Sequence, residues 1–445
     1  MVKETDRKSP EKEVFVPKDK EQEYFQKHNI EFRELKNGIK IIGSTRNVED
    51  VIDANISVDF ATGGYNDPPG KEGLHHLLEH LIINDELQDK AHKLDSQFNG
   101  STGNRIYQFT LEGVAHPSVH EFGVWPFLSG FRDTLANPLA HYQKPDEAID
   151  KEKGVVLREL AEREANEDWK ADRFAEKIIF DHKNPINCPS GGTKEGIANI
   201  SRDDLEQATR QIFIPDRTVV SFTVAGNKQI SSKLTHELED LFEEFPRSDA
   251  SSRPVSLGLC EKLNPNFDRE GVYINTNIQN DISRVNFIWL MSVEDYSVES
   301  FALNRLGSLL SKKIHDYVRS QHLSYGASFG VFPLGKLRLA GAKFLLQSRV
   351  DATDFVAEVR NNILSEFKNI DDQEFEYVNQ LEKLRQIARL MPVFERHSIL
   401  LEGLSDYDRV VDGDKMKEMY QKITTGQMKD WRDRIVQTNP AIFVS

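Results

Sequence analysis

Residues 73–81 read GLHHLLEHL, and the interpretation of the whole chain starts from this stretch. Its leucines recur at the spacing of an amphipathic helix and form one apolar stripe, made by Leu74, Leu77, Leu78 and Leu81. His76 and His80 are four residues apart, so a helix places both imidazoles on one face, with Glu79 beside them. Residues 73–81 therefore predict a helix that presents two histidines and a carboxylate together.

Two imidazoles and a carboxylate on one helical turn are suited to a metal ion. Neutral imidazole is a good zinc ligand, and a catalytic zinc usually takes three protein ligands and one water. The pattern H-x-x-E-H is the inverted zinc-protease motif. An amphipathic helix with ordinary histidines is the alternative, and a chain of 445 residues can contain the motif by chance. A third ligand elsewhere in the chain would separate the two interpretations.

Composition sets limits on the class of protein. A length of 445 residues predicts two or three domains, and no segment has the apolar length that crosses a bilayer, so we expect a soluble protein without a membrane partner. A formal net charge of -15 argues against nucleic acid as a partner. Residues 1–25 are expected to be a disordered arm, because the first 20 are polar and lack the apolar core of a signal peptide. Cys188 and Cys260 form no disulfide framework, which favours a cytoplasmic location.

The first half reads as alternating strands and helices. Residues 31–35 and 40–44 predict a hairpin around Asn37-Gly38, residues 54–61 a further strand, and residues 87–98 a helix. Pro145 begins a long charged helix that contains Glu152 and Glu159. Seven residues are close to two helical turns, so these two carboxylates share a face, where a metal or solvent would compensate their charge.

The second half repeats the order of strands and helices without obvious residue identity. Predicted strands are 271–275, 284–291, 327–332, 338–346 and a short edge strand at 441–444; predicted helices are 298–320, 354–367, 373–390 and 415–434. Polar residues 246–268 read as a linker. We therefore expect two similar α/β domains of an α+β fold, a metal-bearing domain at 26–245 and a second domain at 269–445, each with helices packed on a largely antiparallel sheet.

In these residues and their spacing, the chain resembles the pitrilysin and insulinase family of zinc peptidases, in particular its half-length branch, which includes mitochondrial processing peptidase. The loop GGYNDPPGKEGL at residues 63–74 is similar to the family's entry into the motif helix. The family has a glutamate ligand 75 to 80 residues after the motif, with an auxiliary glutamate seven residues before it. Glu159 follows His80 by 79 residues (159 − 80), and Glu152 precedes Glu159 by seven. The resemblance thus implies one zinc ion per chain on His76, His80 and Glu159.

The resemblance also implies substrate contacts. Residues 99–102, Asn99, Gly100, Ser101 and Thr102, resemble the segment that leads into an edge strand, where an extended peptide adds as a further strand. Tyr325 resembles a tyrosine that reaches the site from the second domain. Arg319 precedes Tyr325 by six residues where the family pattern has seven, which weakens the match of the arginine more than that of the tyrosine.

The implied mechanism is hydrolysis of peptides or unfolded segments by a zinc-activated water. Glu79 would act as general base, Tyr325 would hydrogen-bond the oxyanion, and Glu152 would orient a ligand. The chain corresponds to one half of the family's clamshell, so a homodimer or a heterodimer with a related subunit is expected. Two alternatives stay open: a non-catalytic or partner-dependent subunit, and a metal-dependent hydrolase of small amides.

Overall fold

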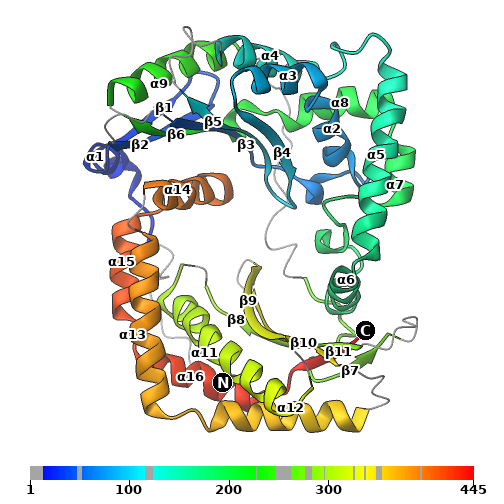
Figure 1. Ribbon diagram of the computed structural model, residues 1–445, viewed down its shortest axis with the longest axis vertical. Helices are drawn as coiled ribbons and strands as arrows, with labels where there is room; N and C mark the ends of the chain where they lie inside the picture. Colours follow the sequence, from blue (N-terminus) through cyan, green and yellow to red (C-terminus); the bar gives the residue numbers. More distant parts are fainter. Residues whose placement is uncertain are drawn as a thin grey trace.

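The computed structural model describes residues 14–47, 53–115, 124–226, 228–245, 262–275, 283–294, 296–323, 326–334, 337–346, 353–390 and 393–445. These residues form two β-sheets with helices packed on each, and the sheets lie at opposite ends of the molecule (Figure 1). The expected α+β class with two similar halves is confirmed. No described helix combines the length and the apolar character needed to span a membrane.

The first sheet has six strands in the order β1-β2-β6-β3-β5-β4. Their bounds are β1 Ile30–Glu34, β2 Lys40–Asn47, β3 Asp53–Phe60, β4 Gln97–Thr102, β5 Tyr107–Ala115 and β6 Thr218–Gly226. β1 and β2 form the predicted hairpin, in which Glu34 pairs with Lys40. The backbone N–H of Gly38 donates to the carbonyl oxygen of Leu35 at 2.9 Å, so the turn around Asn37-Gly38 is tight, as predicted. β4 is the end strand, and residues 99–102 therefore belong to the edge strand itself instead of leading into one.

The helices of the first half are α2 Leu74–Ile82, α3 Asp85–Lys93, α4 Val124–Ala136, α5 Pro145–Ala165, α6 Glu167–Ile179, α7 Lys194–Asn199, α8 Arg202–Ile212 and α9 Lys228–Glu243. All of these except α6 contribute to the core of the first sheet. Alternate side chains of β3, among them Val58 and Phe60, pack in the same core as the leucines of α2. The helix predicted over residues 87–98 is wrong beyond Lys93, because Asp95 adopts a left-handed φ of 53° and the chain then enters β4.

The second sheet repeats this arrangement with five strands in the order β7-β11-β8-β10-β9. Its strands are β7 Val272–Ile274, β8 Ser283–Ser292, β9 Ala327–Leu334, β10 Leu337–Leu346 and β11 Ala441–Val444. In both sheets the last strand of the half, β6 or β11, lies parallel to an early strand and antiparallel to the next. The prediction of residues 441–444 as an edge strand is wrong, because β11 pairs on both sides and all four residues are buried.

The helices of the second half are α11 Val298–Ser320, α12 Thr353–Lys368, α13 Asp372–Arg389, α14 Val393–Tyr407, α15 Gly413–Lys422 and α16 Thr425–Gln437. The single helix predicted over 415–434 is two helices. Thr424 caps α16 through a reciprocal pair of hydrogen bonds with Gln427, which begins a new helix at that point. Helix α14 was not predicted at all.

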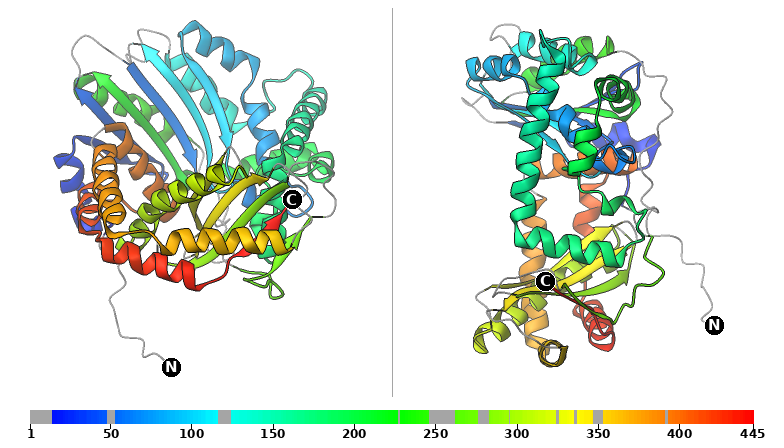
Figure 2. Two further views of the ribbon diagram at one scale, coloured as in Figure 1. Left: turned by 60° about the horizontal axis from the view of Figure 1, so that its bottom comes forward. Right: turned by 90° about the vertical axis from the view of Figure 1, so that its right-hand side faces the viewer.

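Each half lends one helix to the sheet of the other half. α6 packs against β8 and β11, and α14 packs against β2 and β6. α6 and α14 hold equivalent places in the order of elements, each following a β-hairpin and two helices. Figure 2 shows α5 running from the first sheet toward the second, where α6 turns across it. The packing of these two helices therefore crosses the division of the chain expected at residues 246–268, of which 246–261 lie outside the described residues.

The expectation of a disordered arm is wrong for residues 14–25. Val14, Phe15 and Val16 are buried, and their backbone pairs with residues 410–412 next to α14. α1, Glu21–Lys27, then packs Tyr24 and Phe25 into a cluster with Leu400 and Leu404 of α14. The apolar side chains of this segment have a buried surface to cover, and that surface exists only after the second half has folded. Residues 1–13 lie outside the described part.

Candidate metal centre

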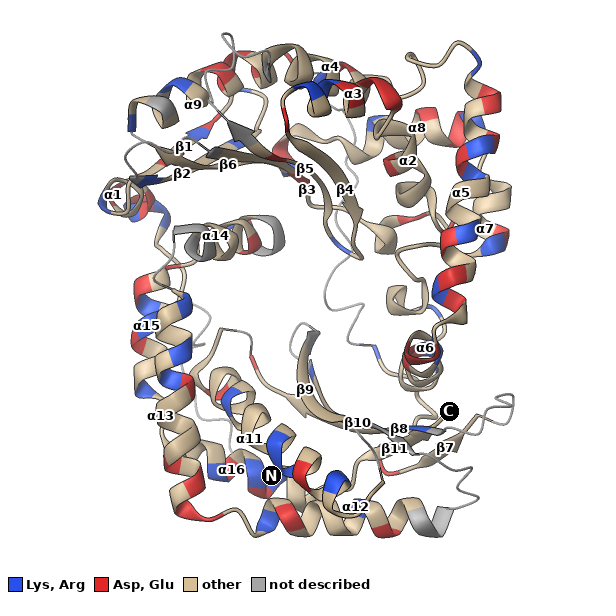
Figure 3. Ribbon diagram, viewed as in Figure 1, with Lys and Arg blue, Asp and Glu red and all other residues tan. Residues whose placement is uncertain are grey.

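The candidate centre is built by two packed helices, α2 and α5 (Figure 1). α2 starts after Gly73, whose φ of 104° suits glycine, and a Cβ at that position would lie 2.8 Å from Ile197 and 3.1 Å from the backbone of Gly192. Sequence spacing alone does not bring these two helices together; the site exists because α5 packs alongside α2. Figure 3 shows acidic and basic residues alternating along α5. Its buried residues are Ile149, Val156 and Leu160.

Three side chains converge at the contact between these helices. Nε2 of His76 lies 3.3 Å from Oε2 of Glu159, and Nε2 of His80 lies 3.6 Å from Oε1 of the same carboxylate. Donor atoms of all three residues lie within 4.8 Å of one another. Two ligand atoms on one tetrahedral zinc ion at about 2.1 Å are about 3.4 Å apart. The spacing and the chemistry of this donor set therefore fit a zinc ion.

The outer nitrogen of each imidazole has a partner of its own. Nδ1 of His76 lies 3.3 Å from the carbonyl oxygen of Gly191, and Nδ1 of His80 lies 3.5 Å from Oε2 of Glu152. A proton on each Nδ1 leaves the Nε2 lone pair directed at Glu159. The carboxylate of Glu152 thus lies behind His80 instead of among the converging atoms.

The surroundings of His76 and His80 shift the pKa values of the two imidazoles in opposite directions. Burial lowers the pKa of His76, and the positive charges of His80 and Arg163 lower it further. Burial also acts to lower the pKa of His80, but the hydrogen bond that it donates to Glu152 and the charge of Glu159 outweigh burial and raise that pKa. Accepting this hydrogen bond lowers the pKa of Glu152. His76 is therefore neutral at pH 7, the form that binds a metal.

Glu79 points into the same cavity but does not join the three converging groups. Its side chain is buried, and the hydroxyl of Thr102 on β4 donates a hydrogen bond of 2.5 Å to its Oε2. Burial raises the pKa of Glu79, and the Thr102 hydrogen bond partly opposes that rise. The cavity has a volume of about 380 Å³ and is lined by His76, Glu79, His80, Ile83, Asn99, Gly100, Ser101, Thr102, Glu152, Glu159 and Arg163.

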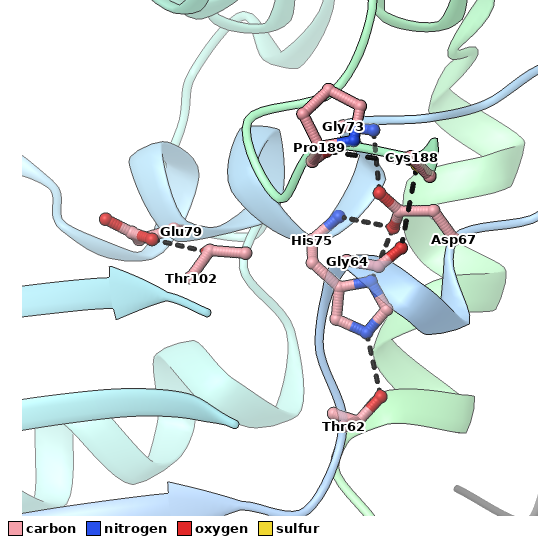
Figure 4. A network of polar contacts seen from close by, with 9 residues as sticks. All are labelled: Thr62, Gly64, Asp67, Gly73, His75, Glu79, Thr102, Cys188 and Pro189. Atoms are coloured by element: carbon pink, nitrogen blue, oxygen red, sulfur yellow. Dashed lines mark hydrogen bonds and ion pairs between the residues drawn. The ribbon is translucent and has the colours of Figure 1, made fainter. Parts of the chain in front are cut away.

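Behind the centre, a second histidine network fixes the start of α2 (Figure 4). Asp67 accepts hydrogen bonds from the backbone N–H groups of Gly73 and His75, at 2.7 and 3.1 Å. The same carboxylate lies 2.5 Å from Nδ1 of His75, whose Nε2 lies 3.0 Å from the hydroxyl of Thr62. This network holds the backbone immediately before His76.

The structure brings together most, but not all, of the residues expected from the sequence. Every predicted site residue of the first half lines the cavity. Arg319 lies exposed in the last turn of α11 and is absent from the lining, which comes wholly from residues 76–163. Tyr325 lies outside the described residues. Arg163 and the Asp67–His75 pair were missed; their signals were the position one turn beyond Glu159 and the acidic residue in the loop before α2.

Comparison with known proteins supplies the family context. A family described as "Peptidase M16 inactive domain" matches residues 199–381, a range that includes none of the residues of the cavity. An uncharacterized zinc protease of Bacillus subtilis, YmxG, is 25% identical over 293 residues, covering 65% of this chain and 67% of that protein. The probable mitochondrial-processing peptidase subunit beta of Schizosaccharomyces pombe is 26% identical over 242 residues, 52% of this chain and 48% of that one.

A further relative is named as a complex subunit and not as a peptidase: cytochrome b-c1 complex subunit 1 of Caenorhabditis elegans. It is 26% identical over 220 residues, 48% of this chain and 44% of that one. The matches thus span about half to two thirds of the relatives' length. Among solved structures, a protease from Helicobacter pylori superposes with a TM-score of 0.74 at 17% identity, covering 93% of this chain and 98% of that one. The periplasmic protease PqqL of Escherichia coli gives a TM-score of 0.68 at 12% identity, covering 93% of this chain but 47% of PqqL.

Proposed function

The chain belongs to the M16 peptidase family, the family of the pitrilysin and insulinase peptidases, and on that premise we propose that it is a zinc-dependent endopeptidase. One observation carries the proposal: the Nε2 atoms of His76 and His80 both lie within 3.6 Å of the Glu159 carboxylate. The relatives named as zinc proteases supply the choice of metal. His76, His80 and Glu159 would hold one zinc ion, with Glu152 orienting His80.

When bound, zinc supplies a water of lowered pKa and polarises the peptide carbonyl. Glu79 is placed to accept the proton of that water, because it lines the cavity beside the ligands without joining them. The hydrogen bond from Thr102 holds the Glu79 carboxylate in one position. The same group would then return the proton to the leaving amine, so no second acid is required.

An extended peptide is the substrate that fits this cavity. The cavity runs along residues 99–102 of β4, and β4 is the end strand of its sheet. The free side of an end strand offers backbone N–H and C=O groups with which an extended chain pairs. Peptides or unfolded segments are therefore the proposed substrates. A hydrolase of small amides has no need for an edge strand, which weighs against that alternative.

The second half contributes no residue to the described lining of the cavity. Arg319 does not line the cavity, so a contact with substrate would need a different arrangement of the halves or a second subunit. We propose a homodimer or a heterodimer with a related half-length chain, supported by the match to less than half of PqqL. A cytoplasmic location is proposed on the low cysteine content alone.

A non-catalytic subunit is the second candidate function. The relative named as a cytochrome b-c1 complex subunit favours it. Against it stands the retention of His76, Glu79, His80 and Glu159 with spacings that suit a metal, since a subunit without catalysis has no chemical need of Glu79.

The test compares peptide cleavage with metal content. The wild-type chain should bind one zinc and cleave a quenched unstructured peptide, lose activity with a chelator and regain it with zinc. Glu79→Gln should keep the zinc and lose about a hundredfold or more in kcat. Glu162→Gln, at an exposed position of α5 outside the cavity, is the matched control and should behave as wild type. Zinc binding without cleavage, alone or with a partner chain, would instead establish the non-catalytic subunit.

A further inference from the structure

Arg163 places a permanent positive charge in a cavity whose other charged lining groups, histidines aside, are carboxylates. It follows Glu159 by one helical turn on α5 and lines the cavity with Glu79, Glu152 and Glu159. Histidines aside, it is the single basic side chain among the described residues of the lining. Nothing in the proposed hydrolysis uses it.

Within the described part of the chain, the guanidinium of Arg163 has no hydrogen-bond or ion-pair partner. Its donors remain available although Glu159 lies four residues before it on the same helix. A guanidinium presents five N–H donors in a planar fork that matches a carboxylate. The group is therefore free to bind an anion that enters from outside.

Contact with Gly191 keeps this guanidinium near the ligands. A Cβ built on Gly191 would lie 2.5 Å from Nη1 of Arg163 and 3.5 Å from its Cζ. The carbonyl of the same Gly191 faces Nδ1 of His76. The arginine head thus lies against the backbone that supports His76, and the absence of a side chain at Gly191 provides its space.

Charge balance shows what this arginine changes. With a bound dication and neutral histidines, the cavity also contains three carboxylates, those of Glu79, Glu152 and Glu159. The net charge of these groups is about −1, and the guanidinium of Arg163 brings it to about zero. An acidic substrate would be repelled from the first arrangement. In the second it meets a neutral site with a guanidinium at its margin.

We propose that Arg163 binds a carboxylate of the substrate and selects peptides with an acidic residue close to the bond that is cleaved. The inference rests on the proposed peptidase function. One helical turn, about 5.4 Å, separates Arg163 from the ligand Glu159. An extended peptide rises about 3.3 Å per residue, so the acidic residue lies within about two residues of the scissile bond.

The experiment uses matched peptides and a charge swap. Quenched peptides carry Glu, Gln or Lys at each position from three before to three after one cleavable bond, in an otherwise neutral sequence. Each is cleaved by the zinc-loaded wild type, Arg163→Gln and Arg163→Glu. The control is Arg158→Glu, the same charge change on an exposed residue of α5 outside the cavity.

At one position near the bond, wild type and Arg158→Glu should favour Glu over Gln by about tenfold in kcat/KM, as expected for a charge-assisted pair. Arg163→Gln should abolish this ratio, and Arg163→Glu should favour Lys instead. Binding gives a readout independent of turnover: a labelled Glu peptide should bind Glu79→Gln about tenfold more tightly than it binds Glu79→Gln/Arg163→Gln.

The two hypotheses fail separately. If the wild type cleaves peptides but its Glu-to-Gln ratio is the same in every Arg163 variant, the role of Arg163 is wrong while the peptidase function stands. If no peptide is cleaved, the peptidase function fails, and the binding comparison still decides whether Arg163 recognises a carboxylate. Equal binding by the single and double variants would overturn that recognition.

Discussion

The carboxylate of Asp67 lies 2.5 Å from Nδ1 of His75, the residue immediately before the proposed ligand His76. The same carboxylate accepts two backbone N–H groups at the start of α2, from Gly73 and His75. A helix of nine residues whose first turn is held in this way has little freedom to rotate. The orientation of the two proposed ligand histidines thus depends on Asp67 and His75, which do not line the cavity.

Asp67→Asn should weaken zinc binding by about tenfold to a hundredfold, the range typical of groups that orient metal ligands. The asparagine keeps the size of the side chain but loses the charge and one acceptor. Competition with a chromophoric chelator measures the affinity. Asp412→Asn, which removes a capping carboxylate from α15 in the second half, should lower thermal stability without changing the zinc affinity. Equal zinc affinities for the wild type and Asp67→Asn would contradict the role of Asp67.

Gly100→Ala should lower kcat while leaving zinc bound. The alanine Cβ would lie 2.9 Å from Cγ of Glu79 and 2.7 Å from Cδ1 of Ile83, so the proposed base must move. Gly154→Ala on α5, whose Cβ would meet only Nη1 of Arg158 at 3.8 Å, is the control and should be tolerated. A Gly100→Ala variant of wild-type kcat would show that Glu79 has room to adjust.

Zinc should stabilise the fold, and Glu159 should carry that effect. A ligand that binds only the folded state adds about 2.7 kcal/mol at a hundred times its Kd. Thermal unfolding with zinc and with chelator measures the difference for the wild type. Glu159→Gln should lose most of the zinc-dependent shift, whereas Glu162→Gln should retain it. A shift of unchanged size in Glu159→Gln would remove Glu159 from the ligand set.

Mild acid should weaken the contact between the halves through His397. This histidine of α14 is buried, its Nδ1 lies 2.9 Å from the hydroxyl of Ser44 on β2, and its Nε2 has no hydrogen-bond partner in the described structure. Burial lowers its pKa to about 4. The unfolded chain protonates this histidine near pH 6.5, so the contribution of neutral His397 to the free energy of unfolding is fully present above that pH. This contribution is lost as the pH falls toward 4, and the loss amounts to about 3 kcal/mol.

Urea unfolding of the wild type and His397→Gln at pH 7.5, 6 and 5 tests this loss. The difference between the two free energies of unfolding should shift in favour of the variant as the pH falls. Burial raises the pKa of Asp59 to about 6, so protonation of this carboxyl increases the free energy of unfolding as the pH falls. Both proteins contain Asp59, so the comparison between them separates its effect from that of His397. Parallel pH curves for the two proteins would show that His397 is not the titrating group.

Local patterns predicted most individual elements. The helical spacing of the leucines gave α2, and Pro145 gave the start of α5. The predicted helix over residues 87–98 was too long because no strong local signal marks the left-handed residue Asp95, where the helix has ended. The predicted helix over residues 415–434 was two helices because the capping pair Thr424 and Gln427 lies inside an apolar pattern. The capping pair was readable from the sequence; the left-handed Asp95 was not.

By itself the sequence determined which side chains share a helical face. His76 and His80 lie together because residues four apart are neighbours on any α-helix, and Glu152 and Glu159 share a face of α5 for the same reason. Tertiary structure decided that the two faces meet, that Arg163 enters the same cavity, and that Arg319 stays outside it. Packing between distant segments also ordered residues 14–27 and carried α6 and α14 across to opposite sheets. Helical periodicity is a property of the local backbone, whereas these contacts depend on apolar surfaces that exist only when both halves have folded.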